Sequence, residues 1–249
     1  MPINSNANVL PKAGDDVIST INIDLQDVAE RALINALEKH KAEFGCVAVM
    51  EVKTGKIKAI ANLRRLEEGL FIEDYNYAIG EHSEPGSTFK LASILAGLED
   101  GFFKLSDSVD TENGRYKFFD RTMIDSKIGG YGKITIGEAF VLSSNVGISK
   151  VINNAYAKQP EKFIDRLYKL QLNSPLNIEI PTPENPKIKT PKSYDWSGTT
   201  LPWMSIGYEV SLTPLHILTF YNAIANKGRM VKPIFVSGLK RNGKFIGVN

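Results

Sequence analysis

The sequence predicts a mixed α and β fold in which helices alternate with antiparallel hairpins. Two segments, one early and one at the end of the chain, show strand-like runs on either side of a tight turn that contains glycine. Between them, apolar residues recur at helical spacing in segments bounded by capping residues, glycine and proline. Helices interleaved with antiparallel hairpins favour an α+β architecture over a doubly wound parallel sheet.

Composition limits the class of protein before any motif is considered. The 249 residues suit one large domain or two small ones, and 43% hydrophobic with 23% charged residues is ordinary for a globular protein. The net charge of +2 and the scattered basic residues argue against nucleic acid as a partner. No run approaches the ~20 apolar residues of a membrane span, and the first residues lack the pattern of a signal peptide.

The first forty residues predict a linker, a strand and a helix. Residues 1–15 are rich in Asn, Pro and Gly, and we expect a linker there, followed by one domain over residues 16–249. Residues 16–23 alternate as a strand does, and Asp24 is expected to cap a helix that runs through Lys41. The apolar face of this helix is expected to comprise Leu25, Val28, Ala29, Ala32, Leu33, Ala36 and Leu37.

An early hairpin and a second helix follow. Residues 45–52 and 56–61 predict two strands joined by a turn at Lys53-Thr54-Gly55, and a loop then leads to Gly86. The apolar-periodic run that begins there predicts a helix closed by Gly101. The single Cys46 lies in the first strand, where a small buried hydrophobe is the favoured interpretation.

The second half of the chain predicts more helices and a closing hairpin. Residues 102–134 are turn-rich. The expected elements after them are two short helices over 135–156 with a break around Ser143–Asn145, a helix over 161–170, a proline-rich loop, a helix over 211–228 once past Pro214, and a hairpin turning at Asn242-Gly243.

Ser87 and Lys90 are the first candidate catalytic residues. Both fall in the expected first turn of the helix after Gly86, where positive partial charge disfavours a cation. Residues three apart lie on one helix face, so the hydroxyl and the amine can meet. An amine neutralised by burial could take the serine proton and leave a nucleophilic oxygen.

Simpler interpretations of this pair remain open. Ser87 could serve only as a helix cap, although a capping box would place Glu or Gln where Lys90 stands. A Ser-x-x-Lys spacing also arises about once by chance in a chain of this composition. A second example, Ser237 and Lys240, lies in the closing hairpin, where residues three apart point to opposite faces and cannot pair.

Ser143 and Asn145 form a second candidate element. They lie on the expected turn between two helices, where a hydroxyl and an amide could face a common cleft. Ordinary capping by serine and asparagine is the alternative. The Ser-x-Asn pattern occurs once in the sequence.

The segments EPGSTFK, LSSNVGISK and SIGYEVSLTPLHILTFYNAIANKGRMVKP resemble the transpeptidase domain of penicillin-binding proteins, most closely the class B, division-type enzymes. The resemblance runs from about Gly14 to the end of the chain. It implies a β-lactamase/transpeptidase-like fold, with an antiparallel sheet flanked by helices and an all-α subdomain. By this resemblance Ser87 is the nucleophile and Lys90 its proton acceptor, Ser143 relays the proton to the leaving amine, and Asn145 holds the substrate peptide.

The resemblance also implies partners and a location. The substrates would be peptidoglycan stem peptides that end in D-Ala-D-Ala, and β-lactam antibiotics would acylate the same serine. No cofactor is implied, and cell-division membrane proteins are possible partners. The parent protein would be anchored in the inner membrane with this domain in the periplasm.

The third family motif, Lys-Thr-Gly, stands in the wrong place. The family carries it after Ser-x-Asn on a sheet edge, whereas Lys53-Thr54-Gly55 precedes Ser87 and is predicted to be a polar hairpin turn. We therefore expect the chain to end before its third motif, with an incomplete sheet and weak or absent activity. Loss of one oxyanion donor alone can lower a rate by ~10²–10³.

Other functions are weighed against this one. A serine β-lactamase or D,D-carboxypeptidase is the enzymatic alternative, but the loop that holds Glu179 and Glu184 lacks the Glu-x-x-x-Asn spacing of a deacylating glutamate. A non-catalytic fragment that binds wall peptides or partners is the alternative from another class. The dispersed His40, His82 and His216 disfavour a metal enzyme, and no glycine-rich phosphate loop is present.

Overall fold

The computed structural model describes residues 14–182 and 184–247, and it contains helices and antiparallel sheets as the sequence predicts. Its helices are α1 (Ile23–His40), α2 (Tyr77–Gly80), the 3-10 helix η1 (Gly86–Phe89), α3 (Lys90–Glu99), α4 (Ile136–Val141), α5 (Asn145–Tyr156), α6 (Pro160–Lys169), α7 (Thr200–Met204) and α8 (Pro214–Ala225). Its strands are β1 (Asp16–Ser19), β2 (Phe44–Met50), β3 (Ile57–Glu67), β4 (Leu70–Ile72), β5 (Ser108–Asp110), β6 (Arg115–Phe118), β7 (Arg121–Ile124), β8 (Lys133–Thr135), β9 (Lys187–Ile188), β10 (Val210–Ser211), β11 (Val236–Arg241) and β12 (Lys244–Gly247).

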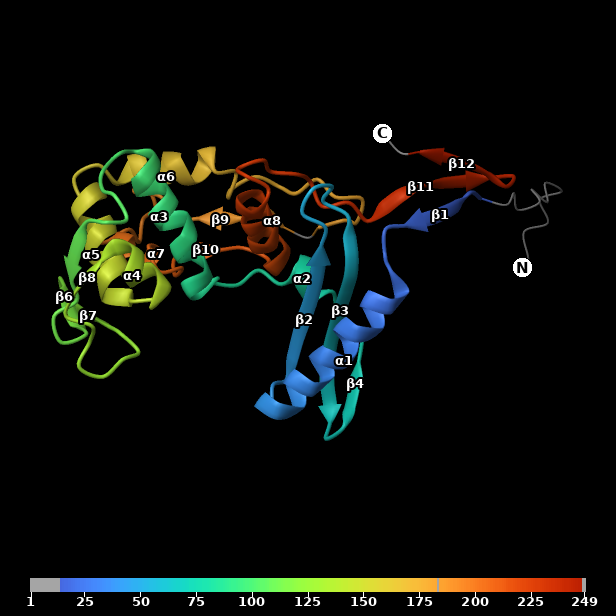
Figure 1. Cartoon of the computed structure of the whole chain (residues 1–249), viewed down its shortest axis with the longest axis horizontal. Coiled ribbons are helices and arrows are strands. Elements are labelled where there is room, and N and C mark those ends of the chain that lie inside the picture. Colours follow the sequence, from blue (N-terminus) through green and yellow to red (C-terminus); the bar gives the residue numbers. More distant parts are fainter. Residues whose placement is uncertain (1–13, 183, 248–249) are drawn as a thin grey trace, which may run out of the picture.

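The elements divide into a helix-rich part and a sheet part (Figure 1). Helices α3 to α7 gather at one end of the molecule, and α8 lies between them and the sheet β2-β3-β4. Helix α1 lies across that sheet, and β1 joins the closing hairpin in the sheet β1-β11-β12. The remaining sheets are the pairs β5-β8, β6-β7 and β9-β10. The predicted α+β class is therefore confirmed.

Helix α1 begins two residues earlier than predicted. Asn22 is its cap, and the Asn22 side chain accepts the Leu25 N–H at 3.0 Å, so the predicted cap at Asp24 is wrong. Asp24 instead lies in the first turn, where its negative charge suits the helix dipole. The buried stripe is also narrower than predicted, because the helix meets the sheet along one row of residues four apart, Ala29, Leu33 and Leu37. Exposed residues of the expected face are Leu25, Val28, Ala32 and Ala36.

The closing hairpin confirms its predicted turn and brings distant parts of the chain together. Asn242 and Gly243 have φ angles of 49° and 79°, the positive values that a two-residue hairpin turn needs. Strand β11 pairs with β1, and an isolated bridge between Lys56 and Ile234 connects this sheet to β3. The predicted linker over residues 1–15 lies outside the described residues except for its last two.

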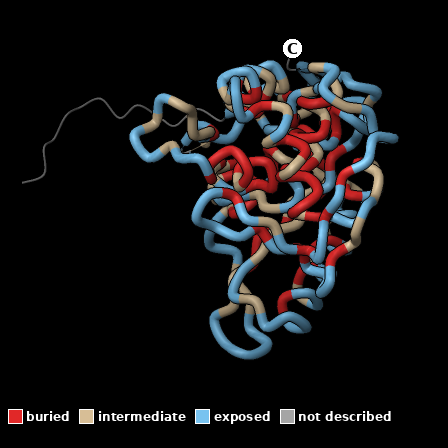
Figure 2. The backbone as a smooth tube through the Cα atoms, turned by 90° about the vertical axis from the view of Figure 1, so that its left-hand side faces the viewer, coloured by how far each residue is buried: buried red, intermediate tan, exposed pale blue. Residues whose placement is uncertain are grey.

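Of the three buried clusters in the described residues, one fills the helix-rich part and another joins α8 to the sheet. The larger one fills the helix-rich part, where the interior of the tube in Figure 2 is mostly buried, and includes Phe89, Tyr156 and Phe163. A second cluster packs Leu215 of α8 against Ile57 of β3. Full burial of each such side chain contributes roughly 1.5–3 kcal/mol. The larger cluster includes Phe89 of η1 and Ile94 of α3, so it holds these two elements against the other helices.

Most remaining predictions match the structure. The differences are short elements and the end of β3, which runs to Glu67 whereas the predicted strand ends at residue 61. The break around residues 143–145 falls between α4 and α5, and Gly101 has φ +71° just after α3, as predicted. Strands β5 to β8 occupy the segment predicted to be turns, and β4 lies in the predicted loop before Gly86. Each of these strands has only three or four residues, too few for a period-two pattern to be visible.

Candidate active site

Lys90, Ser143 and Asn145 meet in one hydrogen-bonded cluster. Lys90 opens α3, and the residue is only 1% exposed. Its Nζ donates to the Ser143 carbonyl oxygen at 2.6 Å, to Ser143 Oγ at 3.0 Å and to Asn145 Oδ1 at 2.6 Å. The structure therefore joins the lysine of the first motif to both named residues of the second, across more than fifty positions of sequence.

Ser87 lies one turn before Lys90 on the exposed surface. It belongs to η1 rather than to the predicted α-helix, and the Lys90 N–H donates to the Ser87 carbonyl oxygen. In a 3-10 helix residues three apart eclipse each other, so the two residues share one side of the chain. Among the described hydrogen bonds of Lys90 Nζ, none goes to the Ser87 hydroxyl, because the amine is turned toward the Ser-x-Asn turn.

The backbone around Ser87 is held from two sides. The Gly86 N–H donates to the Gly207 carbonyl at 3.1 Å, and Tyr221 of α8 donates its hydroxyl to the Thr88 carbonyl at 2.9 Å. Gly207 has φ +92°, and a Cβ there would lie 2.0 Å from the Gly86 carbonyl oxygen. Only glycine fits this close approach, which keeps the Ser87 turn fixed against the segment before β10.

Burial makes the Lys90 amine unusually easy to neutralise. Desolvation lowers the pKa of Lys90 from 10.5 to about 8, and the nearby Asp125 carboxylate opposes this by favouring the charged form. About 9% of an amine with this pKa is neutral at pH 7, against about 0.03% at the ordinary value. A buried lysine with a depressed pKa beside a serine is the arrangement that proton transfer from the serine requires.

When the Lys90 ammonium loses a proton, one of the three hydrogen bonds that it donates must be given up. An ammonium group has three N–H donors and no acceptor, and Lys90 Nζ makes three hydrogen bonds to oxygen atoms of Ser143 and Asn145. A neutral amine keeps two donors and gains a lone pair. Deprotonation therefore frees one direction at the nitrogen, from which it can accept a proton.

Ser143 is held in a strained backbone conformation. Its φ of 54° lies in the left-handed region, which costs a residue other than glycine of order 1–3 kcal/mol. This conformation turns both the carbonyl oxygen and Oγ of Ser143 toward Lys90 Nζ. Strain of this kind persists where the surroundings fix the backbone. Here hydrogen bonds of the next two residues, from the Ser144 hydroxyl to Asp125 and from Asn145 Nδ2 to the Ile124 carbonyl, hold the turn.

Asp125 is part of this site and was not identified from the sequence. It follows β7, is 5% exposed, and accepts the Ser144 hydroxyl at 3.0 Å and the Val146 N–H at 2.9 Å. The carbonyl of Ile124 beside it accepts Nδ2 of Asn145 at 2.8 Å. A single aspartate in a turn-rich segment carries no local pattern, so only the tertiary structure shows that it supports the Ser-x-Asn turn.

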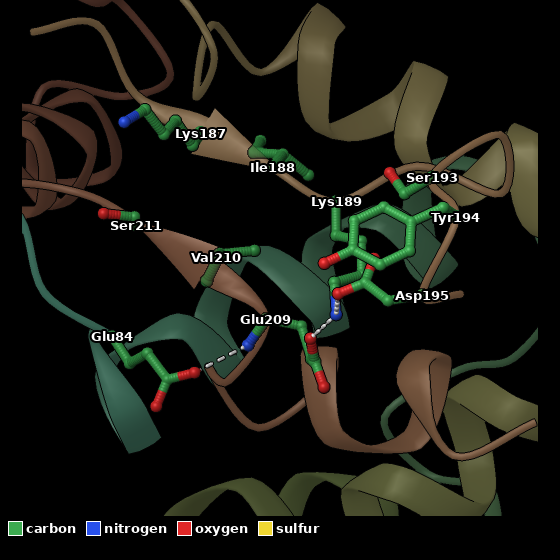
Figure 3. Close-up of a pocket in the computed structure, with 10 residues that line it drawn as sticks. All are labelled: Glu84, Lys187, Ile188, Lys189, Ser193, Tyr194, Asp195, Glu209, Val210 and Ser211. Carbon is green, nitrogen blue, oxygen red and sulfur yellow. Dashed lines mark hydrogen bonds and ion pairs between the residues drawn. The ribbon is translucent and has the colours of Figure 1, made fainter. Parts of the chain in front are cut away.

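Glu84, three residues before Ser87 in the sequence, lines a pocket of about 480 Å³ (Figure 3). Strands β9 and β10 line it together with Glu84, and the Glu209 N–H donates to the Glu84 carboxylate at 3.0 Å. Lys189 forms ion pairs with Glu209 and, at 2.8 Å, with Asp195. None of the four predicted site residues lines this pocket.

The other candidates of the sequence lie elsewhere. Lys53-Thr54-Gly55 forms the turn between β2 and β3, where Thr54 donates to Glu51 and Gly55 has φ +78°. Cys46 is half-buried in β2, where burial raises the pKa of its thiol. In residues 14–182 and 184–247, no group of three or more His, Cys, Asp or Glu side chains could hold a metal ion.

The chain is similar over most of its length to known transpeptidase domains. The model of the penicillin binding protein transpeptidase domain matches residues 45–245. The chain is 29% identical over 226 residues to the probable peptidoglycan D,D-transpeptidase PbpC of Pseudomonas aeruginosa, and this alignment covers 89% of the chain and 39% of that protein. It is 27% identical over 229 residues to the peptidoglycan D,D-transpeptidase FtsI of Buchnera aphidicola, with 90% and 39% covered.

Solved structures show the same fold. Penicillin binding protein 3 of Mycobacterium tuberculosis in complex with ampicillin superposes with a TM-score of 0.82 at 25% identity, over 97% of this chain and 54% of that one. The transpeptidase domain of penicillin-binding protein 3 from Burkholderia pseudomallei gives a TM-score of 0.76 at 23% identity, over 94% and 65%. These structures confirm the predicted transpeptidase-like fold.

The fold is that of penicillin-binding protein transpeptidase domains. The match over residues 45–245 then identifies the family: the chain belongs to the transpeptidase-domain family of penicillin-binding proteins. It spans 39% of the length of the first curated relative and 34% of the second. No helix within residues 14–182 and 184–247 has both the length and the apolar character to cross a membrane.

Proposed function

We propose that residues 16–249 belong to a peptidoglycan D,D-transpeptidase domain that crosslinks stem peptides through an acyl-enzyme on Ser87. The observation that carries this proposal is the buried Lys90, whose Nζ lies 3.0 Å from Ser143 Oγ and 2.6 Å from Asn145 Oδ1, one turn after an exposed serine. The resemblance of the three segments that carry these residues to the family's motifs supports the assignment of their roles.

In the first half-reaction Ser87 Oγ attacks the carbonyl carbon of the penultimate D-alanine of a donor stem peptide. The Oγ–C bond forms, the amide C–N bond to the terminal D-alanine breaks, and the serine proton passes to Lys90 Nζ. Ser143 Oγ lies within hydrogen-bonding distance of Nζ, and it gives its proton to the leaving amine while it takes one from Lys90. In the second half-reaction the amine of another stem peptide attacks the ester carbonyl carbon, so that a C–N bond forms and the C–Oγ bond to Ser87 breaks. The proton that the attacking amine loses returns to Ser87 Oγ by way of Ser143 and Lys90.

A β-lactam would enter at the same first step. Ser87 Oγ would attack the ring carbonyl and open the ring C–N bond, and the amine would stay attached to the acyl group. The mycobacterial penicillin binding protein 3, which has this fold, was solved in complex with ampicillin. A penicillin is therefore a suitable probe. The two classes of ligand in this proposal are therefore stem peptides and β-lactams, without a cofactor.

Residues 146–249 contain no Lys-Thr-Gly triplet after the Ser-x-Asn element. By the resemblance, that triplet binds the substrate carboxylate and helps to form the oxyanion hole, and loss of one oxyanion donor lowers a rate by ~10²–10³. We therefore propose that these 249 residues alone acylate slowly. The parent protein would act at the periplasmic face of the inner membrane, with cell-division proteins as partners.

The test is covalent labelling by a fluorescent penicillin over minutes to hours, read on a denaturing gel. Ser87→Ala should abolish the label, because no nucleophile remains. Ser237→Ala is the matched control, since Ser237 belongs to the other Ser-x-x-Lys spacing and its hydroxyl bonds to the Ser19 carbonyl in the β1-β11 sheet. A label that survives Ser87→Ala would contradict the assignment.

Slow labelling needs its own control. A chimaera in which a Lys-Thr-Gly segment from a relative follows Asn249 should be labelled faster than the chain itself. If neither protein is labelled while both are folded by circular dichroism, the transpeptidase proposal fails. The non-catalytic alternative would gain support from that same result.

Rapid hydrolysis of the acyl-enzyme is disfavoured by where the two candidate glutamates lie. The Glu179 carboxylate accepts the Phe235 N–H at 3.2 Å and lies 3.8 Å from Lys232 Nζ. Both contacts bind it to the segment before β11. Glu184 pairs with Lys187 on the same exposed loop. A long-lived acyl-enzyme, rather than β-lactamase turnover, is therefore expected.

A further inference from the structure

Asp125 carries a buried carboxylate that joins two separate parts of the site. It directly follows β7, at the point where the β6-β7 hairpin meets the first turn of α5. The Ser144 hydroxyl lies 3.0 Å from both of its oxygens, and the Val146 N–H donates to Oδ1 at 2.9 Å. Both donors come from the segment that carries the Ser-x-Asn element, so the Asp125 carboxylate alone binds that segment at two points.

These bonds fix the residues on either side of Ser144. Its hydroxyl also accepts the Gly147 N–H at 2.8 Å, so Ser144 caps α5 while it donates to Asp125. Ser143 on one side keeps its left-handed φ of 54°, and Asn145 on the other keeps its amide toward Lys90. Loss of one partner would leave the buried Asp125 carboxylate or its donors unsatisfied, which costs free energy of folding. The hydrogen bonds of Asp125 to Ser144 and Val146 can therefore hold the strained turn in place.

The carboxylate also acts on Lys90 through its charge. Its negative charge raises the pKa of Lys90, against the larger lowering that desolvation causes. Cations of the surrounding elements have other partners: Lys127 lies over the Tyr131 ring at 5.0 Å, and Arg121 of β7 lies over the Trp203 ring at 4.4 Å. On α5, Lys150 pairs with Glu112 at 2.9 Å.

We propose that Asp125 is a positioning residue of this site, which holds the Ser143–Asn145 turn against Lys90 and keeps a negative charge near the Lys90 amine. The inference rests on the proposed function but concerns a residue that neither motif includes. The hydrogen bonds of Lys90 Nζ go to Ser143 and Asn145 and not to Asp125. Asp125 acts through its hydrogen bonds to Ser144 and Val146 and through the electrostatic effect of its charge. Its two effects are separable, because one depends on hydrogen bonds and the other on charge.

The test compares Asp125→Asn with Ser144→Ala. Asparagine keeps the size of the side chain but removes its charge, so the pKa of Lys90 should fall below that of the wild type. Ser144→Ala removes the hydroxyl bond but keeps the charge, so the pKa should stay where it is. Both variants should acylate about tenfold more slowly at high pH, because the Ser143–Asn145 turn is less well fixed.

Two readouts separate the outcomes. The pKa of Lys90 is followed by NMR through the Cε and Nζ signals of isotopically labelled lysine, with Lys90→Arg to assign them, and acylation is followed with fluorescent penicillin from pH 6 to 10. An unchanged or raised pKa in Asp125→Asn would overturn the electrostatic part. Unchanged acylation in Ser144→Ala would overturn the positioning part, even if Asp125→Asn fails to fold.

These results do not depend on the success of the proposed function. If the wild-type chain is not acylated at all, the proposed function fails in this form, yet the NMR titration still measures the effect of Asp125 on Lys90. The positioning part then rests on hydrogen exchange of the Val146 and Gly147 amides, which donate to Asp125 and to the Ser144 hydroxyl and should exchange faster in both variants. Exchange at the wild-type rate in both variants would overturn it.

Discussion

The acylation of Ser87 is expected to depend on pH through the state of one buried amine. Lys90 must be neutral to accept the serine proton, and desolvation brings the pKa of Lys90 to about 8. As pH rises from 6 to 9 the neutral fraction therefore increases from about 1% to about 91%. If proton transfer to Lys90 limits acylation, the rate at pH 9 should be about 90-fold the rate at pH 6, with a midpoint near pH 8.

Burial is the cause of the low pKa of Lys90 on which this prediction depends. A shift of the Lys90 pKa from 10.5 to about 8 corresponds to about 3 kcal/mol, because each pKa unit is 1.36 kcal/mol. At pH 7 it raises the neutral fraction by about 300-fold. The same shift makes folding stability increase between pH 8 and 10.5, since the unfolded chain binds the lysine proton more tightly than the folded one in that range.

The assay is the pseudo-first-order rate of labelling by fluorescent penicillin, measured from pH 6 to 10 and corrected for hydrolysis of the probe. Lys90→Arg is the control, because a guanidinium stays protonated throughout this range and should leave only a residual rate. A rate that does not change with pH, or one that rises only above pH 10, would refute a base with the pKa that burial gives Lys90.

Two further predictions concern stability and follow from single residues. Ser143→Gly should be more stable than Ser143→Ala by about 1 kcal/mol in urea unfolding, since both remove the hydroxyl but only glycine relieves the left-handed φ of 54°; equal stabilities would show that the turn is not strained. Burial lowers the pKa of His216 from 6.5 to about 4, so the stability present above pH 6.5 should be lost as pH falls toward 4. Between pH 7.5 and 4.5 His216→Gln should lose about 2.5 kcal/mol less than the wild type, and an equal loss would contradict the buried neutral ring.

The long elements and the two motifs could be predicted from the sequence. Their signals are local: a capping residue, an apolar row at helical spacing, or a glycine after the last turn. The position of Ser87 and Lys90 one turn apart is local too, and the predicted break around Ser143–Asn145 is confirmed. The resemblance of three segments to the transpeptidase family predicts the fold around them.

The rest depends on contacts between distant segments. The sequence placed Lys90 beside Ser87, but the described hydrogen bonds of its amine go to Ser143 and Asn145. Asp125 could not be predicted as a support, because its partners lie about twenty residues further along the chain. The cap at Asn22 was missed because Asn and Asp are equally good caps and both stand at the start of α1.

The most direct test of the central claim is to find which side chain a penicillin acylates. Intact-mass measurement after incubation with benzylpenicillin should show one added penicilloyl group, and peptide mapping should place it on Ser87. An adduct on Ser143, on Ser144 or on a lysine would contradict the assignment of the nucleophile, even if the protein binds penicillin.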